Sequence, residues 1–441
     1  MAEVLKPFAQ KSVAVIGGGI AGLSAAAKLI EQGISVTLFE AAPQLGGRAR
    51  RVNFNNLALD NGQHILLGAY HQTLALLSLV GISETSVLLR QPLSLHIYGA
   101  MRLKTCSYLP APLHLLIGIC FAMGLNFGEK LKLIRFFIWL KSQGFKVSKD
   151  LPLLDFLDAY CPSPKLTQTL WEPLCLAALN TPIQQASTQV FLNVLRDSFN
   201  NKKNDSDLLL PKTDLSSALA EPIATYIQSK GGLIMCNQTI NKVEQSKHGF
   251  RLKSKSEEIF DFSHVIIATS PAHAKNLGLA LNMPVFSYQP IYTVYLQYPA
   301  ETKLPSIMTG FCNKLSQWIF DRGALCSQTG LMSVVISAEG QHQDLTQTQL
   351  AEAITQELAS AFPELPPPLW HKVIAEKRAT FSCTTALKRP AIETTIPNLY
   401  LAGDYVTSGC ALTEYPATIE GAARSGLACA AKIARQTQAK S

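Results

Sequence analysis

The chain lacks the signatures of several common classes of protein. Its 441 residues contain ten cysteines, but no two of them form a C-x-x-C pair, which argues against a zinc or dithiol redox site and favours reduced thiols in a cytosolic protein. Zinc-finger spacings, recognition-helix patterns and aromatic RNA-binding motifs are also missing, so the net charge of +8 does not by itself indicate a nucleic-acid partner. We therefore expect no metal, no nucleic acid and a cytoplasmic location.

Long apolar runs are scarce as well. The most apolar run, from Leu113 to Leu125, is well short of the ~20 apolar residues that span a bilayer. Residues 1–11 are mixed and show no secretory signal, so we expect the first strand to begin at about Ser12. Hydrophobic residues nevertheless make up 47% of the chain and charged residues only 16%, which fits a soluble protein with a large core or one that touches a membrane.

What the sequence does contain, close to its start, is a β-α-β unit. Ser12 to Ile16 has the pattern of a buried strand, a glycine-rich turn follows, and a helix is expected from Ala21 to Gln32. Ile34 to Phe39 has the pattern of a second buried strand, and Gly33 ends the helix before it. Such a unit is the building block of a parallel sheet covered by helices.

The turn of this unit carries the spacing G-x-G-x-x-G. The first glycine makes the tight turn, the second lets backbone approach a phosphate, and the third lets helix and strand pack closely. Free amides at the start of the helix favour an anion there, and Glu40, which ends the second strand, is placed to bind ribose hydroxyls. The sequence thus predicts a Rossmann-type fold. The residues expected to contact the dinucleotide here are Gly17, Gly19, Ile20, Ala21, Gly22, Glu40 and Ala41.

The other elements of this domain are expected from distant segments. Asp214 caps a helix that runs to about Lys230, and a last helix runs from about Thr418 to Ala434. Short strands are expected near 233–236, 249–253 and 259–262, as a meander, and buried strands near 264–268 and 398–402. We therefore predict an α/β dinucleotide-binding domain from residues 1–85, 211–275 and 393–441, and a discontinuous α+β substrate domain from residues 86–210 and 276–392. The first insert should be helical from 113 to 160, and the second should hold strands near 291–298, 332–337 and 373–379.

Two further motifs narrow the dinucleotide. Gly46, Gly47 and Arg48 follow the second strand as a G-G-R segment, and Gly403-Asp404 follows the strand near 398–402. Together with the glycine turn they resemble the amine oxidase and phytoene desaturase superfamily of flavoproteins, whose dinucleotide domain is of the glutathione reductase-like class. The resemblance covers nearly the whole chain and implies bound FAD. It implies that Arg48 faces phosphate and that Asp404 bonds the ribityl or phosphate region.

The same resemblance implies contacts to both ends of FAD. Amides near Thr418 and Ile419, in the segment that continues to Ala422, face the pyrimidine edge of the flavin, where a helix N-terminus stabilises the negative charge of the reduced ring. The backbone of Val243 contacts adenine. No cysteine or histidine matches a covalent attachment motif, so we expect non-covalent FAD that denaturation removes.

A third segment, Asp60 to Tyr70, begins D-N-G-Q-H. This version, with the segment from Pro416 to Gly426, resembles the squalene-associated desaturase-like group. The resemblance implies reductive removal of the hydroxyl of hydroxysqualene by reduced FAD, and it places Gly62, Gln63 and His64 beside the flavin. Because hydroxide is a poor leaving group, a proton donor is needed. His64 and Asp60 are the candidate catalytic residues, with Glu414 and Tyr415 as further possibilities.

The partners that this interpretation implies are a long apolar isoprenoid and a separate electron donor, because no second G-x-G-x-x-G is present. Residues 113–140 combine apolar runs with Lys130, Lys132 and Arg135 and with Trp139, which suits either a helical patch on a bilayer surface or an ordinary helical subdomain. Three alternatives stay open: a carotenoid-type desaturase, which removes hydride; an amine oxidase, for which Tyr405 and Tyr415 offer aromatics; and a flavin-binding scaffold without turnover. The oligomeric state is left open.

Overall fold

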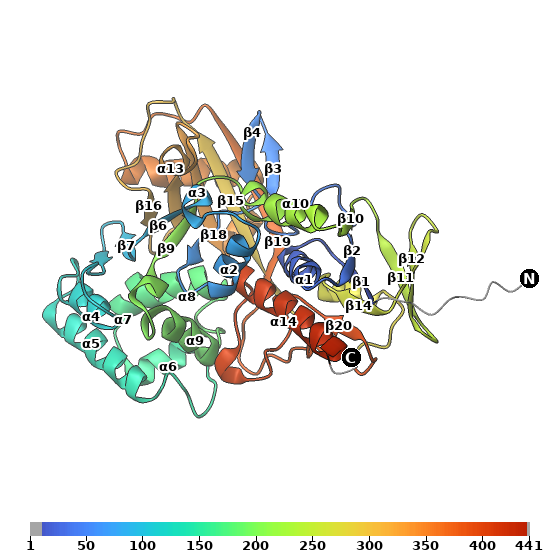
Figure 1. Ribbon diagram of the computed structural model, residues 1–441. Coiled ribbons are helices and arrows are strands. Elements are labelled where there is room, and N and C mark those ends of the chain that lie inside the picture. The colour runs from blue at the N-terminus through green and yellow to red at the C-terminus, as the bar shows by residue number, and fades with distance from the viewer. Residues whose placement is uncertain (1–10, 439–441) are drawn as a thin grey trace, which may run out of the picture.

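The computed structural model describes residues 11–438, so the expectations for residues 1–10 and 439–441 lie outside the described residues. A parallel sheet joins the two ends of the chain with its middle (Figure 1). Across the sheet the strands are β10 (Leu233–Met235), β2 (Ser35–Phe39), β1 (Ser12–Ile16), β14 (His264–Ile267) and β20 (Leu399–Leu401). The expected α/β fold is confirmed.

Both faces of this sheet are buried, as the continuous apolar runs of its strands predict. Val13 and Val15 pack with the helices α1 (Ile20–Glu31), α10 (Glu221–Ser229) and α14 (Ile419–Gln438). Ala14 and Ile16 belong to the core on the opposite side. The period of two along β1 therefore divides one strand between two hydrophobic cores.

A three-stranded antiparallel meander covers that opposite side, and one expectation about it was wrong. Its strands are β11 (Ile240–Ser246), β12 (Gly249–Ser254) and β13 (Ile259–Phe262), and the rings of Phe260 and Phe262 pack against Phe39 of the parallel sheet. Residues 233–235 were expected to open the meander, but they pair in parallel with β2 at the edge of the main sheet. The first meander strand is β11, whose mostly exposed polar residues give little strand signal.

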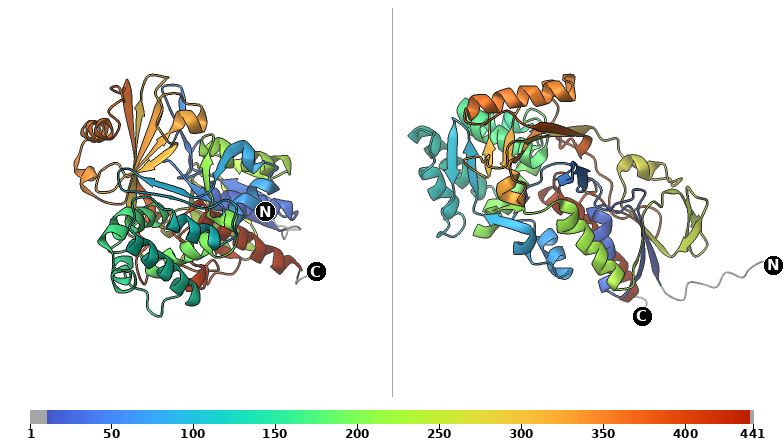
Figure 2. Two further views of the ribbon diagram at one scale, coloured as in Figure 1. Left: turned by 90° about the vertical axis from the view of Figure 1, so that its left-hand side faces the viewer. Right: turned by 90° about the horizontal axis from the view of Figure 1, so that it is seen from above.

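A second, seven-stranded sheet stands over the carboxyl ends of the parallel strands. Neighbouring strands within this sheet are antiparallel, except that β16 and β7 are parallel to each other. The strands are, in order, β19 (Trp370–Phe381), β15 (Tyr288–Gln297), β18 (Leu331–Ser337), β17 (Trp318–Asp321), β16 (Met308–Gly310), β7 (Ser94–Ile97) and β8 (Met101–Lys104). Helix α13 (Gln347–Ala361) covers its outer face, as Figure 2 shows in orange, and leaves the inner face for the site.

The first insert is helical, as predicted, but it is divided. Its helices α4 (Leu113–Cys120), α5 (Phe127–Ser142) and α6 (Leu153–Tyr160) lie at the end of the molecule opposite the meander (Figure 1). Asn126 caps α5 with its side chain, which explains the break before that helix. No helix within residues 11–438 is both long and apolar enough to cross a bilayer.

The boundaries between the two expected domains stay a prediction. The remaining α-helices and strands of the described chain are α2 (His71–Leu79), α3 (Glu84–Val87), α7 (Pro164–Leu166), α8 (Glu172–Leu179), α9 (Thr188–Phe199), α11 (Pro271–Lys275), α12 (Arg322–Cys326), β3 (Arg51–Phe54), β4 (Leu57–Asp60), β5 (Leu66–Leu67), β6 (Leu88–Gln91) and β9 (Leu208–Pro211).

Candidate functional site

A cavity of about 650 Å³ lies between the carboxyl ends of the parallel strands and the inner face of the seven-stranded sheet. This crevice is where open α/β sheets bind ligands, because loops after neighbouring strands diverge there. The cavity brings together most of the residues predicted from sequence. Those that line it are Gly17, Gly19, Ile20, Ala21, Glu40, Ala41, Gly46, Gly47, Arg48, Gly62, Gln63, His64, Gly403, Asp404, Thr418, Ile419 and Ala422.

Two glycines of the first turn serve different purposes. A Cβ on Gly22 would lie 1.9 Å from the carbonyl oxygen of Gly17, so only glycine fits between helix α1 and strand β1. A Cβ on Gly19 would meet nothing nearer than 3.9 Å, and the backbone there is extended, which any residue tolerates. Packing therefore explains Gly22, which lies outside the lining. Gly19 instead keeps a stretch of cavity wall free of side chain.

The second glycine segment lies directly on the first. The amide of Gly46 donates to the carbonyl of Gly18 at 2.8 Å, and Gly19 and Gly46 pair as a parallel bridge. Gly47 has a φ of +62°, and a Cβ there would come within 3.2 Å of the Cα of Gly19. The two glycine loops thus form one continuous backbone wall.

This wall ends in a helix N-terminus. Helix α1 begins after Gly19 with no side chain capping its first turn and no acidic residue in that turn. Its first amides are accordingly open to a ligand, and the helix dipole favours an anion there. A bare backbone wall beside an uncapped helix of twelve residues has the chemistry that a pyrophosphate needs.

Glu40 tightens the same turn from the neighbouring strand. Its carboxylate accepts hydrogen bonds from the amides of Gly18 at 2.6 Å and Ala42 at 2.8 Å. It lines the cavity, and each carboxylate oxygen has a further lone pair for a ribose hydroxyl. A negative charge here also disfavours a 2′-phosphate.

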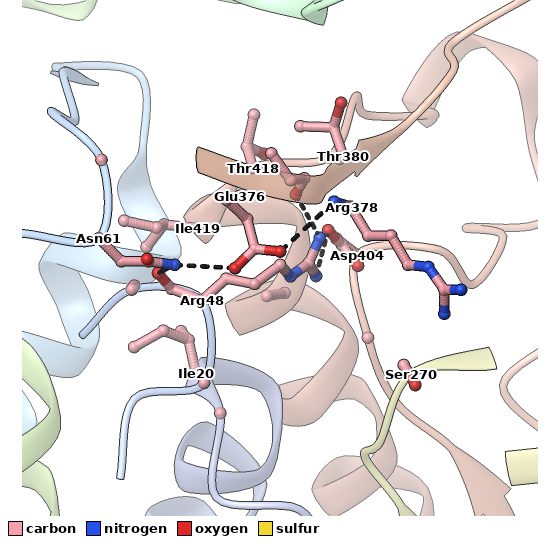
Figure 3. Close-up of a pocket in the computed structure, with 18 of the residues that line it drawn as sticks. Ile20, Arg48, Asn61, Ser270, Glu376, Arg378, Thr380, Asp404, Thr418 and Ile419 are labelled. Atoms are coloured by element: carbon pink, nitrogen blue, oxygen red, sulfur yellow. Dashed lines mark hydrogen bonds and ion pairs between the residues drawn. The ribbon is translucent and has the colours of Figure 1, made fainter. Parts of the chain in front are cut away.

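Arg48 and Asp404 meet inside the cavity (Figure 3). Arg48 donates from Nη2 to the Asp404 carboxylate at 2.7 Å and from Nη1 to the Ala379 carbonyl at 2.7 Å. The charge of Asp404 raises the pKa of Arg48. The residue predicted to face phosphate and the residue predicted to bind the ribityl region therefore form an ion pair with each other. Arg48 also connects the glycine wall to strand β19.

The turn from Asn61 to His64 forms another wall. The Asn61 side chain donates to the Glu376 carboxylate at 2.9 Å, and both residues line the cavity (Figure 3). His64 is mostly buried, and burial, reinforced by the charge of Arg48, lowers its pKa to about 4. At neutral pH it is an uncharged imidazole that can donate one hydrogen bond and accept another.

Asp60, a predicted catalytic residue, is not part of the lining of the cavity. It is 1% exposed, its carboxylate accepts from the Leu215 amide at 2.8 Å, and it pairs with Arg322 at 3.5 Å. Burial raises the pKa of Asp60 to about 6. Asp60 is the last residue of β4, and its side chain points into protein rather than into the cavity.

Arg322 connects this buried acid to the cavity. It donates from Nη1 to the Gln63 side-chain oxygen at 2.8 Å, and Ser333 donates to the same oxygen at 3.3 Å. With its oxygen held by two donors, the Gln63 amide is turned so that its NH₂ group remains for other partners, one of which is the His64 carbonyl at 3.4 Å. Sequence reasoning missed Arg322 because it lies in an isolated segment without a motif.

Three other predicted residues also lie outside the lining. Val243 is fully buried, and its amide donates to the Leu277 carbonyl at 2.8 Å, so Gln238 and Ile240 line the cavity in its place. Glu414 is held by Arg389 and Ser408, and the Tyr415 hydroxyl donates to Asp197. These contacts leave Glu414 and Tyr415 to support the loop that leads into α14.

The start of α14 completes the wall around His64. Thr418 and Ile419 line the cavity, and the Thr418 hydroxyl accepts from the Gly421 amide at 3.1 Å. Glu420 is fully buried, and its carboxylate accepts from the amides of Gln72 and Thr73 at the first turn of α2. This fixes the last helix against the segment that follows the His64 turn.

Apolar side chains also line the cavity, and they were not predicted residue by residue. They are Ile65, Leu176, Leu179, Ile291, Trp318, Phe320, Val335 and Phe381, which come mainly from α8 and the seven-stranded sheet; the same sheet also contributes the polar residues Ser337, Glu376, Arg378 and Thr380. Tyr405 also lines the cavity, and its buried hydroxyl has no hydrogen-bond partner among the described residues. The cavity thus combines a wall of backbone and polar groups with these apolar side chains, which we call the apolar chamber.

Comparison with known proteins identifies the family of the chain. A family model described as flavin containing amine oxidoreductase matches residues 20–434, and the chain belongs to that family. It is a flavin-dependent oxidoreductase with the α/β fold of the group.

Individual relatives and solved structures are similar to this chain over most of its length. Hydroxysqualene dehydroxylase of Rhodopseudomonas palustris is 29% identical over 436 residues, covering 94% of this chain and 96% of that protein. The 15-cis-phytoene desaturase of Solanum lycopersicum is 24% identical, covering 97% of this chain and 78% of that protein. Among solved structures, cyclohexylamine oxidase from Brevibacterium oxydans superposes with a TM-score of 0.68 at 17% identity, covering 97% of this chain and all of that one.

Proposed function

We propose that this chain binds FAD non-covalently and uses its reduced form to convert hydroxysqualene to squalene. The observation that carries the proposal is the similarity to hydroxysqualene dehydroxylase over 94% of the chain. The apolar chamber that adjoins the dinucleotide wall supports it, because a long hydrocarbon requires such a lining.

The lining residues fit FAD group by group. The bare wall at Gly19 and Gly47 and the first amides of α1 would hold the pyrophosphate, and Glu40 the adenosine ribose. Arg48, already paired with Asp404, would add a positive charge near the phosphates. A cavity of about 650 Å³ is within the range of ligand sites, roughly 300–1,000 Å³.

The overall reaction takes one proton and one hydride and releases water, with the C–O bond broken and a C–H bond formed. The bound reduced flavin, which carries two hydrogens, would supply the hydride and balance the proton. The chain's own part is to exclude water with Trp318 and Phe320, to orient the allylic carbon, and to hold the leaving hydroxyl. We assign the last role to His64, which lines the cavity as a neutral imidazole.

The electron donor is proposed to be a separate protein or a quinol, since the sequence has no second G-x-G-x-x-G turn. A desaturase acting on an apolar isoprenoid is the second candidate, favoured by the similarity to phytoene desaturase along 97% of the chain. Fold and cofactor are common to both activities, and they differ in the direction of hydride transfer.

The test is anaerobic incubation of the photoreduced holoprotein with hydroxysqualene. Reoxidation of the flavin with stoichiometric squalene is the expected result. The parallel reaction uses oxidised holoprotein with phytoene, and desaturated products there, with no squalene in the first reaction, would establish the desaturase instead. His64→Ala should retain FAD and lose turnover; wild-type turnover in this variant would remove His64 from the mechanism.

A further inference from the structure

Among the described residues, helix α4 exposes apolar side chains on one of its sides. Leu115 and Ile119 are buried against the core. On the opposite side Leu113, Ile117 and Phe121 follow one another at intervals of four residues, which places them on one face of the helix, and Phe121 is 79% exposed. A helix with apolar residues on both sides normally has both sides covered.

The turns at both ends of α4 also expose apolar residues. Tyr108 before the helix is 95% exposed, and Phe127 after it is 82% exposed. We define the α4 face by its exposed members, which are Tyr108, Leu113, Ile117, Phe121, Met123 and Phe127. Scattered single apolar residues are normal on a protein surface, whereas a contiguous set marks a site of interaction.

Cationic residues belong to the segments that adjoin α4. Arg102 exchanges two backbone hydrogen bonds with Met123, at 2.9 and 3.1 Å, and the backbone of Lys104 packs against Gly118 on α4. Lys130 donates to the Cys120 carbonyl at 3.0 Å. Residues 100–135 hold five cationic residues and one acidic residue, Glu129, which is occupied in capping α5.

We propose that the α4 face docks this protein on the surface of an anionic lipid bilayer. Exposed aromatic and aliphatic side chains would enter the interfacial region, and the cations of the adjoining segments would lie against anionic headgroups. A second copy of the chain fits this surface less well, because a two-fold contact would bring the same cations from both copies together. The proposal is independent of the substrate assigned above.

Apart from Tyr108, this surface lies within residues 113–140, where the sequence suggested a bilayer-facing patch. Trp139 of that segment does not belong to it, because its ring stacks on Tyr160 at 4.7 Å and on Phe136 at 6.0 Å. Helix α5 thus turns its tryptophan to an aromatic cluster between helices. The α4 face lies on α4 and its flanking turns, at the outer end of the molecule (Figure 1).

Flotation of the FAD-loaded full chain with vesicles tests the proposal. Vesicles of phosphatidylcholine with phosphatidylglycerol are compared with vesicles of phosphatidylcholine alone. We expect binding to the anionic vesicles that weakens with added salt. Phe121→Ser/Phe127→Ser should lower binding about tenfold or more, because two inserted rings are lost. Arg102→Gln/Lys104→Gln should reduce the preference for anionic vesicles.

The matched control is Val285→Ser/Leu369→Ser, which removes two exposed apolar side chains elsewhere on the surface and should bind as wild type does. Tyr108→Trp gives a second readout, with a blue shift of tryptophan emission on binding. The proposal is overturned if wild type fails to bind anionic vesicles, or if the Phe121 and Phe127 variant binds equally well. A dimer in light scattering that this variant abolishes, without vesicle binding, would assign the face to a second copy instead.

Discussion

The guanidinium of Arg48 lies 2.7 Å from the carboxylate of Asp404, although the two residues are 356 positions apart in the chain. Each belongs to a short motif at one end of the sequence. Their contact closes the cavity, since Arg48 also donates to a carbonyl of β19 in the second sheet. A single side chain thus joins three walls of the site.

Replacing Arg48 by methionine should weaken FAD binding about tenfold to a hundredfold, because a charge-assisted contact near the phosphates is lost. Arg48→Lys keeps the charge but has only one donor nitrogen and should lie between the two. Titration of apoprotein with FAD, followed by flavin fluorescence, measures the effect. Equal affinities in all three proteins would remove Arg48 from the dinucleotide site.

Replacing Gly19 and Gly22 by alanine should affect two different properties of the protein, namely FAD binding and stability. Gly19→Ala should leave the apoprotein as stable as wild type and impair FAD binding, since its Cβ has space in the fold but enters the ligand's wall. Gly22→Ala should destabilise the apoprotein by about 1–3 kcal/mol or more, because its Cβ collides with Gly17. Urea unfolding of the apoproteins separates the two effects; a stable Gly22→Ala would contradict the packing described here.

Acid should destabilise the protein through His64. The pKa of this histidine falls from 6.5 in the unfolded chain to about 4 in the fold. Between these values the unfolded state binds the proton, so His64 lowers stability progressively as the pH falls from about 6.5 to 4, by up to about 3 kcal/mol. Above pH 6.5 this loss is absent.

The measurement compares urea unfolding of wild type and His64→Gln across this range. Asp60, whose pKa is raised to about 6, acts in the opposite direction between about pH 4 and 6, since there the unfolded state has lost the proton that the fold retains. Because Asp60 is present in both proteins, the difference between them isolates His64. A difference that stays constant with pH would show that His64 titrates normally.

Removing Arg322 should be costly because it leaves Asp60 buried and unpaired. We expect Arg322→Met to lower the free energy of unfolding by about 3–5 kcal/mol, and Asp60→Asn/Arg322→Met to recover part of that loss. Arg322→Met should also shift the visible spectrum of bound FAD, since it frees the Gln63 amide to rotate. If the double variant recovered nothing, the two groups would not be coupled.

That the glycine loops gather at one cavity could be predicted from sequence, because the constraints on them are local. Gly17 to Gly22, Gly46 to Arg48 and Gly403-Asp404 each follow a strand, and loops after parallel strands gather at one edge of a sheet. The apolar chamber could not be predicted in this way. Every residue of β18 is buried, so alternation in the sequence does not show that Val335 faces the cavity while Val334 packs under α13.

Asp60 shows the limit of a motif within one segment. It is adjacent in sequence to residues that line the cavity, yet the side chain of a strand residue points away from that of its neighbour. Its partners, Leu215 and Arg322, come from distant parts of the chain. Only the three-dimensional arrangement separates a buried structural acid from an acid that meets a ligand.

The order of strands in the parallel sheet has a consequence for how the protein is made. Strand β2 ends at Phe39, but β20 begins only at Leu399, and α14 packs on α1. At a synthesis rate of roughly 5–20 residues per second, the first β-α-β unit therefore waits roughly 20–70 s on the ribosome before its last partners emerge. Because residues from both ends of the chain line the cavity, the complete cavity forms only after translation has reached the final helix.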